Sequence, residues 1–342
     1  MKASYLQGHG GLEVLQYGDI PAPQPGPGQV AVRVRFAALN HLDIWVREGL
    51  PGLKLKFPHV LGGDASGVVE SLGPGVTGFR EGESVVVHPG LACHKCPKCL
   101  GGWESLCPEY KILGEQVSGT HAEVVVVPAA NLFPLPATLS FEEGAAVPLV
   151  FTTAWQMLVR RAAVMPDETV LVHAAGSGVG SAAIQIAKLL GARVIATAGS
   201  EEKLALARRL GADATINYSK EDFATAVRQQ IRGGVDVIFD HLGQEFWPGN
   251  IKAIRNGGRI AVCGATSGGD GVTDLKHVFF RQIQILGSTM GSKGDFPRLL
   301  SLLGQRKMRA VVDSTFELAD SKKAFVRMQE RAVCGKVLLR VS

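Results

Sequence analysis

Four of the six cysteines lie within fifteen residues, at Cys93, Cys96, Cys99 and Cys107. Thiolates at these spacings suit one tetrahedral zinc ion. The first residues contain no apolar segment typical of a secretory signal, so we expect a cytoplasmic protein whose clustered cysteines bind metal rather than form disulfides. Because four thiolates complete the shell and leave no place for substrate water, we predict one structural Zn2+. The alternative is four unrelated thiols or a redox switch.

A glycine-rich turn joins a predicted strand at 169–173 to a predicted helix at 178–190. Glycines in such a turn let the backbone approach a pyrophosphate, whose charge the helix N-terminus stabilises. The match to GxGxxG is imperfect, because Ser181 stands where the third glycine would be. The strand–turn–helix context nevertheless favours a dinucleotide site over a simple tight turn. The predicted contacts in this turn are Gly176, Ser177, Gly178, Val179 and Gly180.

The end of the next strand, 193–197, indicates which dinucleotide binds. NAD enzymes usually place an acidic residue there to hold the ribose 2′-hydroxyl, and this strand carries none at its tip. Ser200 can hydrogen-bond a 2′-phosphate and Lys203 can neutralise it, so we predict NADPH rather than NADH. Tyr218 is included among the predicted cofactor contacts. The alternative is that Glu201 or Glu202 turns back to the ribose while Lys203 remains a surface lysine.

The order of elements predicts a two-domain α/β fold. Short strands at 30–36, 67–70 and 83–87 and an extended proline-rich connector at 21–28 characterise the first third. From about residue 150, strands at 169–173, 193–197, 215–217, 235–240, 259–263 and 284–286 alternate with helices at 178–190, 201–210 and 222–231. This alternation is typical of a doubly wound, six-stranded parallel sheet. The last fifty residues are expected to be irregular until a strand at 336–341.

Composition excludes two classes of partner. The chain has 342 residues, 46% apolar and 20% charged, and a net charge of +5, which together favour a soluble protein of two domains. Charges of both signs are interleaved and no basic run alternates with aromatic residues, so we expect no nucleic-acid partner. Apolar runs such as 124–127 are too short to span a bilayer, so we expect no membrane partner.

With these motifs the chain resembles the medium-chain dehydrogenase/reductase superfamily, on the branch where zinc alcohol dehydrogenases and quinone oxidoreductases meet. The resemblance rests on segments 40–49 and 59–67, the cysteine cluster and the nucleotide domain. It implies a GroES-like β-rich catalytic domain at 1–148 with a zinc lobe at about 90–110 and a Rossmann domain at 149–288. It also implies that residues 289–342 return to the catalytic domain. A homodimer or homotetramer, joined through the edge strand near 284–287, is expected.

The catalytic zinc of that superfamily does not carry over. In its zinc enzymes a cysteine stands where this chain has Asn40, and a His-Glu pair stands where it has Gly63 and Asp64. The third ligand would fall near Val150 or Phe151. Asn40, with Asp43 and Arg47, instead resembles the zinc-free quinone oxidoreductases, whose asparagine lies near the nicotinamide.

The chemistry predicted from this combination is NADPH-dependent reduction of a small hydrophobic quinone or α,β-unsaturated carbonyl. Oxidising an unactivated alcohol needs a Lewis acid, whereas the delocalised charge formed here can be held by two or three hydrogen-bond donors. Asn40 should orient the substrate or nicotinamide and Asp43 should support it, unless Asp43 only caps its loop. His41 and His59 are nearby candidates for proton donation, and either can equally be structural.

Two alternatives stay open. One is an alcohol dehydrogenase whose zinc is displaced to residues such as Asp64, Glu115 or His121. The other is a protein that retains NADPH without turnover.

Overall fold

The computed structural model describes the whole chain, residues 1–342, and its Cα positions divide into two compact units. Unit 1 comprises Met1–Thr152 and Ser292–Ser342, and unit 2 comprises Thr153–Gly291. The predicted domain boundaries, after residues 148 and 288, lie a few residues before these limits.

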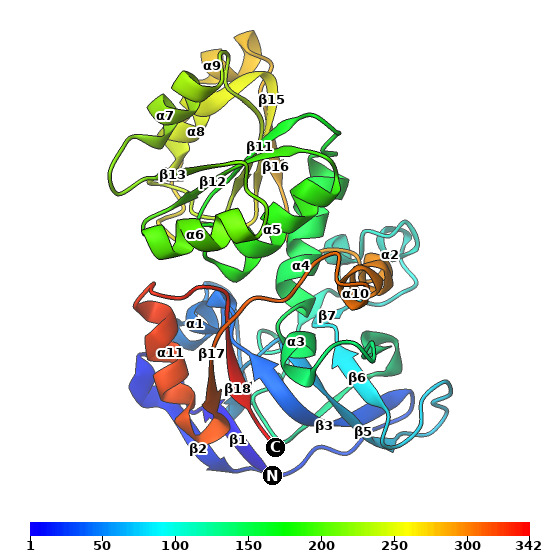
Figure 1. The fold of residues 1–342 in the computed structure, drawn as a ribbon. Helices are drawn as coiled ribbons and strands as arrows, with labels where there is room; N and C mark the ends of the chain where they lie inside the picture. The colour runs from blue at the N-terminus through cyan, green and yellow to red at the C-terminus, as the bar shows by residue number, and fades with distance from the viewer. The chain divides into compact units, whose positions relative to one another are not determined.

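Unit 2 is built on a six-stranded parallel sheet in the order β13-β12-β11-β14-β15-β16. Leu171, Ile195 and Ile238 are fully buried, as residues of a parallel sheet covered by helices on both faces must be. Helices α5 and α6 lie on one face and α7 and α8 on the other (Figure 1), which confirms the predicted doubly wound α/β arrangement. The strands are β11 (Thr169–Val172), β12 (Arg193–Ala198), β13 (Ala214–Asn217), β14 (Val235–Asp240), β15 (Ile254–Val262) and β16 (Gln284–Gly287). The helices are α5 (Gly178–Leu189), α6 (Glu201–Arg209), α7 (Phe223–Gln230), α8 (Trp247–Ala253) and α9 (Leu275–Phe280).

Unit 1 contains a seven-stranded sheet in the order β10-β6-β5-β3-β18-β17, in which β9 also pairs with β3. Along β3, Val32 and Val34 are fully buried while Arg33 between them is exposed, so one face of the strand covers the core. Smaller sheets join β2, β1 and β4, and β7 and β8. The strands are β1 (Lys2–Leu6), β2 (Leu15–Asp19), β3 (Gln29–Ala38), β4 (His59–Val60), β5 (Asp64–Leu72), β6 (Ser84–Val87), β7 (Gly90–Leu91), β8 (Lys111–Ile112), β9 (Val124–Pro128), β10 (Leu132–Pro134), β17 (Val312–Glu317) and β18 (Lys336–Arg340).

Several short helices complete unit 1. Helix α4 (Pro148–Trp155) begins in unit 1 and continues as a π-helical segment, Gln156–Arg161, in unit 2. The other helices are α1 (His41–Glu48), α2 (Pro97–Leu100), α3 (Phe141–Ala145), α10 (Phe296–Gly304) and α11 (Ser321–Gln329). Single 3-10 turns lie at Leu12–Val14, Glu104–Leu106, Ala129–Asn131, Lys293–Asp295 and Leu318–Asp320.

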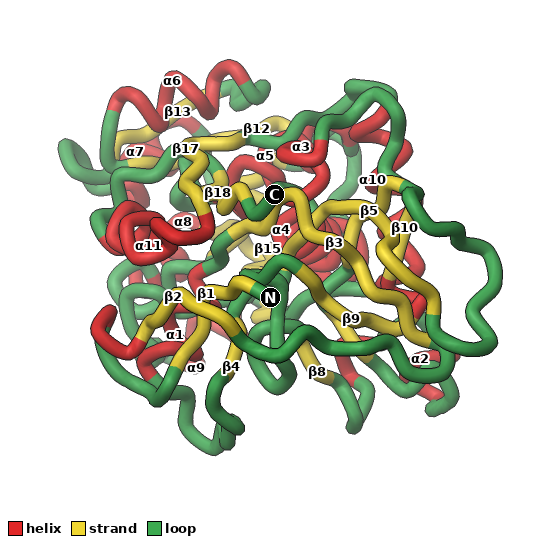
Figure 2. The backbone as a smooth tube through the Cα atoms, turned by 90° about the horizontal axis from the view of Figure 1, so that it is seen from below, coloured by secondary structure: helices red, strands yellow, loops and turns green.

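The expectation of an irregular C-terminal segment is wrong. Residues 296–340 form α10, β17, α11 and β18, with α11 packed beside β17 and β18 (Figures 1 and 2). Helix α10 buries Phe296, Leu299, Leu300 and Leu303, whose spacing of three and four positions marks one face of a helix. The same spacing is visible in the sequence, which therefore carries the signal for this helix.

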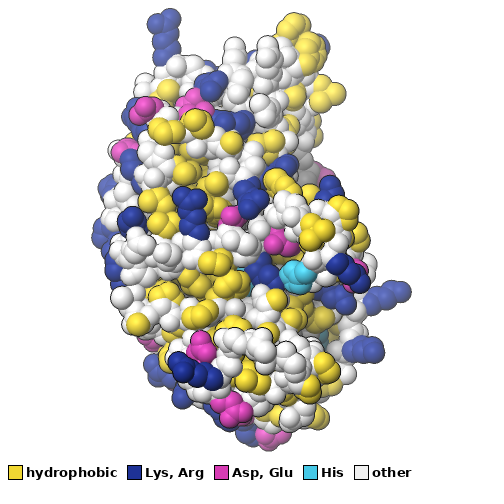
Figure 3. Space-filling model, turned by 90° about the vertical axis from the view of Figure 1, so that its right-hand side faces the viewer, with side chains coloured by type: hydrophobic (Ala, Val, Ile, Leu, Met, Phe, Trp, Pro, Cys, Tyr) yellow, Lys and Arg dark blue, Asp and Glu magenta, His cyan; other side chains and the backbone are white.

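The surface agrees with the charge pattern of the sequence. Lysine and arginine side chains are scattered among acidic and apolar ones over the face drawn in Figure 3. No helix of the protein is long and apolar enough to cross a membrane.

Candidate functional site

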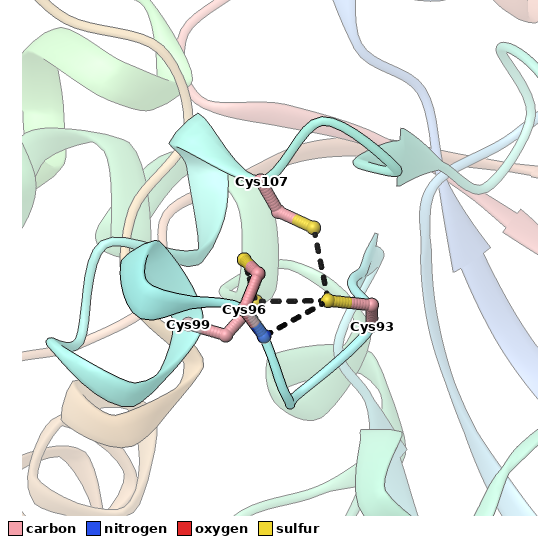
Figure 4. Close-up of side chains that lie close together, drawn as sticks. All are labelled: Cys93, Cys96, Cys99 and Cys107. Carbon is pink, nitrogen blue, oxygen red and sulfur yellow. Dashed lines mark hydrogen bonds between the residues drawn. The ribbon is translucent and has the colours of Figure 1, made fainter.

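The predicted zinc lobe brings its four cysteines together around one point (Figure 4). Their sulfur atoms all lie within 4.8 Å of one another. The Sγ–Sγ distances are 3.5 Å for Cys96–Cys99, 3.5 Å for Cys93–Cys107 and 3.9 Å for Cys93–Cys99. A tetrahedron with Zn–S bonds of about 2.3 Å has edges of about 3.8 Å. The three printed separations are close to this edge, so the cluster fits a zinc ion.

Local backbone geometry prepares this cluster for a cation. Backbone N–H groups donate to sulfur, from Cys96 to Cys93 Sγ and from Glu109 to Cys107 Sγ, both at 3.4 Å. Hydrogen bonds from the Lys95 and Cys96 backbone lower the pKa of Cys93 to about 6, while burial raises the pKa of Cys99 to about 12. Since the buried Cys99 thiolate is unfavourable alone, a divalent cation is what would bring all four sulfurs to the thiolate form. Bound zinc there would be structural, because the shell has no open position.

The glycine-rich turn has the tight geometry expected of a phosphate-binding turn. Ser177 is the N-cap of α5, and its Oγ accepts a hydrogen bond from the N–H of Gly180 at 2.9 Å. A Cβ added to Gly180 would lie 2.5 Å from the carbonyl oxygen of Ala174, so only glycine allows this close approach. The Ser177 hydroxyl also lies 3.1 Å from His241 Nε2. The turn therefore presents the N-terminus of a twelve-residue helix at the carboxyl end of β11.

The predicted cofactor residues from separate segments gather at this same edge of the sheet. Because β12 and β13 pair in parallel, with Ala198 opposite Asn217, their carboxyl ends bring Ser200 and Tyr218 to adjacent positions. The Lys203 stem lies against the glycine turn, since a Cβ on Gly176 would be 2.7 Å from Lys203 Cγ.

Glu201, the alternative partner of the ribose hydroxyl, is already engaged by neighbouring side chains. Its carboxylate accepts from Asn217 Nδ2 at 3.3 Å and lies 3.5 Å from Lys220 Nζ and 3.7 Å from an Arg208 nitrogen. The Asn217 hydrogen bond, with the nearby positive charges, lowers the pKa of Glu201. Ser200 acts as the N-cap of α6 and receives the Lys203 N–H at 3.5 Å.

Asp43, predicted to support Asn40, hydrogen-bonds the backbone on either side of the Asn40 loop. One carboxylate oxygen accepts the Asn40 backbone N–H at 2.7 Å, and the other accepts the Gly62 N–H at 2.9 Å. Asp43 is 2% exposed, and burial raises its pKa to about 7 against the opposing effect of these two hydrogen bonds. It thus caps α1 and also ties α1 to the segment that carries Asp64.

Strand register then brings together three polar side chains that are distant in sequence. Strand β18 runs antiparallel to β3 with Leu338 opposite Ala38, and two residues before Leu338 the Lys336 side chain reaches Asn40, the N-cap of α1. On the other side of β3, Ala38 pairs with Asp64. Asn40, Asp64 and Lys336 are therefore neighbours across three strands, and all three are buried.

The contacts within this buried cluster satisfy most of its polar atoms. Lys336 Nζ lies 3.0 Å from Asp64 Oδ2, 2.5 Å from Asn40 Oδ1 and 2.8 Å from the Leu39 carbonyl oxygen. Asn40 Nδ2 donates to Asp64 Oδ2 at 2.9 Å, and the Leu149 N–H donates to Asp64 Oδ1 at 2.8 Å. The amide of Asn40 has two hydrogens, and these contacts use one of them.

Lys336 is the residue that sequence reasoning missed, since it was interpreted only as the start of the last strand. Its signal was a lysine directly before the apolar run 337–339, where burial of its stem is expected.

The histidines considered for proton donation take different positions. His59 is buried and its Nε2 lies 3.1 Å from the Gly114 carbonyl oxygen, and burial lowers its pKa. His41 is exposed at the start of α1, with its ring edge-on to Trp45. His59 is thus held by a structural contact, and neither ring is hydrogen-bonded to Asn40.

The residues proposed for a displaced zinc are not brought together as a ligand set. The structure assembles one group of His, Cys, Asp or Glu side chains that could hold a metal ion, and it consists of the four cysteines. Asp64 instead pairs with Lys336, and His121 is fully buried with no hydrogen-bond partner at either ring nitrogen. The half-buried Glu115 has its pKa raised by burial.

Comparisons with known proteins agree with this architecture. Residues 26–137 match the alcohol dehydrogenase GroES-like domain family, and residues 178–305 match the zinc-binding dehydrogenase family. A solved structure named as an NAD-dependent alcohol dehydrogenase is 53% identical, with a TM-score of 0.97 over 100% of both chains. An acryloyl-coenzyme A reductase from Metallosphaera sedula is 32% identical over 99% of both chains. A quinone oxidoreductase from Pseudomonas aeruginosa is 32% identical over 97% of both chains.

Proposed function

Because the chain belongs to the medium-chain dehydrogenase/reductase superfamily and is an oxidoreductase, we propose that it reduces a quinone or α,β-unsaturated carbonyl with NADPH and without a catalytic metal. The observation that supports this best is the buried cluster of Asn40, Asp64 and Lys336, which contains an amide donor and a lysine cation but no thiolate or imidazole. The resemblance places the other catalytic-zinc ligands of its zinc enzymes at Gly63, Asp64 and Val150 or Phe151; only Asp64 has a ligand atom, and it is paired with Lys336.

The role of the chain in this reaction is to hold the acceptor oxygen. Bound NADPH would supply a hydride directly to a ring carbon or the β-carbon of the substrate. Negative charge then develops on the conjugated oxygen, and the unused N–H of Asn40 can donate to it. Asp43 keeps Asn40 in place through the backbone. A proton from solvent water then neutralises the oxygen. No Lewis acid is needed, because the conjugated system spreads the charge.

The choice of NADPH over NADH rests on the residues that follow β12. Lys203 lies against the glycine turn and Ser200 is the N-cap of the helix that carries it, whereas Glu201 is engaged by Asn217 and nearby cations rather than left to meet a ribose hydroxyl. The name of the 53% identical structure favours NADH instead. Titration of the wild-type protein with each cofactor decides between them: we expect tighter binding of NADPH, and tighter binding of NADH would refute this part.

We further propose that two copies associate through the edge of the sheet in unit 2, in the cytoplasm. Strand β16 is the last strand of its sheet, and its Ile285 is 44% exposed. Apolar side chains also gather at the top of Figure 3. Helix α9, which precedes β16, carries Phe279 and Phe280, whose exposed fractions are 61% and 76%. An exposed edge strand with adjacent apolar rings is suited to pairing with a second copy.

A panel of acceptors tests the proposed reaction. Oxidation of NADPH should be followed with quinones, enones and simple aldehydes, and the reverse reaction with primary alcohols. We expect turnover with the conjugated acceptors, a reduced rate in Asn40→Ala and no change in Asn256→Ala, which removes an exposed asparagine of β15. Turnover of primary alcohols alone, with no reduction of conjugated acceptors, would refute the proposal.

The second candidate is an NAD-dependent alcohol dehydrogenase, favoured by the name of the 53% identical structure. It would need a catalytic metal held outside the cysteine cluster. Two zinc ions per chain together with alcohol oxidation would establish it, whereas the reductase proposal expects one. Retention of NADPH without turnover is not supported, because relatives that match the whole chain are named as enzymes.

A further inference from the structure

We propose that Lys336 is a positioning residue of this site, whose buried ammonium fixes the Asn40 amide so that one N–H is directed to the substrate oxygen. The inference rests on the proposed reductase function and adds a residue to it.

The ammonium group of Lys336 is held in one position by its hydrogen bonds. It is 4% exposed, and its three N–H donors meet three acceptors, the Leu39 carbonyl, Asn40 Oδ1 and Asp64 Oδ2. Only one of these acceptors, Asp64, is a charged partner. Lys336 is the first residue of β18, two residues from the Leu338–Ala38 pair, so a strand paired with β3 carries the ammonium rather than a flexible loop.

The orientation of the Asn40 amide follows from the two charges beside it. In the observed orientation Oδ1 faces the Lys336 cation and Nδ2 faces the Asp64 carboxylate. A flip of the amide would put its NH2 group against the ammonium and its oxygen against the carboxylate, so two charge-assisted hydrogen bonds would be lost. Lys336 and Asp64 therefore hold one orientation, in which the second Nδ2 hydrogen remains for a ligand.

A purely structural ion pair would explain the contacts less completely. Burying two charges is a weak route to stability, because desolvation offsets much of their attraction. The strands β3, β5 and β18 are already joined by backbone hydrogen bonds, as their registers show. Both Lys336 and Asp64 contact the Asn40 amide, and fixing the orientation of that amide explains the charged pair better.

Chemical rescue separates the two roles. Lys336→Ala deletes the side chain beyond Cβ, a fragment that n-propylammonium matches. In the zinc-loaded protein, kcat/KM for quinone should fall about tenfold or more, because one charge-assisted contact is lost. Added n-propylammonium should restore most of the activity that Lys336→Ala loses, including its kcat. Tetramethylammonium, which has no N–H donor, should restore none of it. The control variant Lys323→Ala, which removes an exposed lysine of α11, should have wild-type activity.

Thermal melting gives a readout that does not need activity. Propylammonium should raise the melting temperature of Lys336→Ala saturably and leave wild type unchanged. If Lys336→Ala does not fold, Lys336→Met/Asp64→Asn removes both charges together. That variant should fold, keep a low kcat and show no response to propylammonium.

Three results would overturn the proposal. They are a folded Lys336→Ala with wild-type kcat/KM, a melting temperature restored by propylammonium without restored kcat, and a double variant with wild-type activity. If wild type oxidises alcohols but reduces no conjugated acceptor, the reductase proposal fails separately, and Lys336 is judged by the same criteria on alcohol oxidation.

Discussion

His121 is a buried histidine whose replacement should remove an acid sensitivity of unit 1. The side chain is fully buried, neither ring nitrogen has a hydrogen-bond partner, and the ring lies edge-on to Phe325. Burial lowers its pKa from 6.5 to about 3, with a smaller contribution from the Lys336 charge and against the opposing effect of a backbone contact with Ala38 that falls short of normal hydrogen-bond geometry. The variant His121→Met retains an apolar side chain of similar size and cannot titrate.

The sign and size of the effect follow from this shift. The unfolded chain binds a proton at His121 more readily than the folded protein, so its contribution to stability is complete above pH 6.5 and is lost as the pH falls toward 3. Between pH 8 and pH 5 the loss from this one group is about 2 kcal/mol. Between pH 8 and pH 5, His121→Met should therefore lose about 2 kcal/mol less free energy of unfolding than the wild type. At pH 8 the two proteins should differ by less than about 1 kcal/mol, because the ring makes no hydrogen bond of normal geometry that the substitution would remove.

Urea denaturation at pH 8 and pH 5, followed by circular dichroism, measures the difference. The control is His277→Met, which replaces an exposed histidine on α9 and should leave the pH dependence as in wild type. Equal losses of stability in wild type and His121→Met would refute the reasoning. Loss of zinc from His121→Met at pH 8 would show instead that this histidine binds metal.

Three further predictions follow from the zinc lobe, the cofactor edge and the exposed strand. Cys96→Ser should lower zinc content and melting temperature while the folded fraction still transfers hydride, and unchanged metal content would contradict the zinc assignment. Lys203→Ala should weaken NADPH binding by about 1–3 kcal/mol and barely change NADH binding, as measured by fluorescence titration; equal weakening of both would contradict it. Ile285→Lys on β16 should shift the protein toward monomer in size-exclusion chromatography with light scattering, and an unchanged mass would exclude this edge as the interface.

Features set by nearby residues could be predicted from the sequence. The cysteine cluster spans fifteen positions from Cys93 to Cys107, so its spacing alone defines a metal site. The strands and helices of unit 2 follow local patterns, and β14 begins and ends at the predicted residues, Val235 and Asp240. Helix α4 was not predicted, because Pro148 to Trp155 is apolar nearly all round and shows no helical period.

The reaction site could be predicted only in part, because its contacts cross the whole chain. Asn40 and Asp43 lie on one turn of α1 and were identified from a resemblance. Lys336 is 296 positions from Asn40 and 272 from Asp64, and only the strand order β5-β3-β18 brings them together. No local sequence pattern encodes this strand order, so the position of Lys336 in the site could not be predicted from the sequence.

The measurement that tests the central claim most directly is the metal dependence of hydride transfer. Zinc content and the initial rate of NADPH-dependent quinone reduction should be measured before and after treatment with a chelator that removes only exposed metal. We predict one zinc per chain, an unchanged rate, and a reduced rate in Asn40→Ala that added zinc does not restore. Primary-alcohol oxidation that the chelator abolishes and zinc restores would contradict the account.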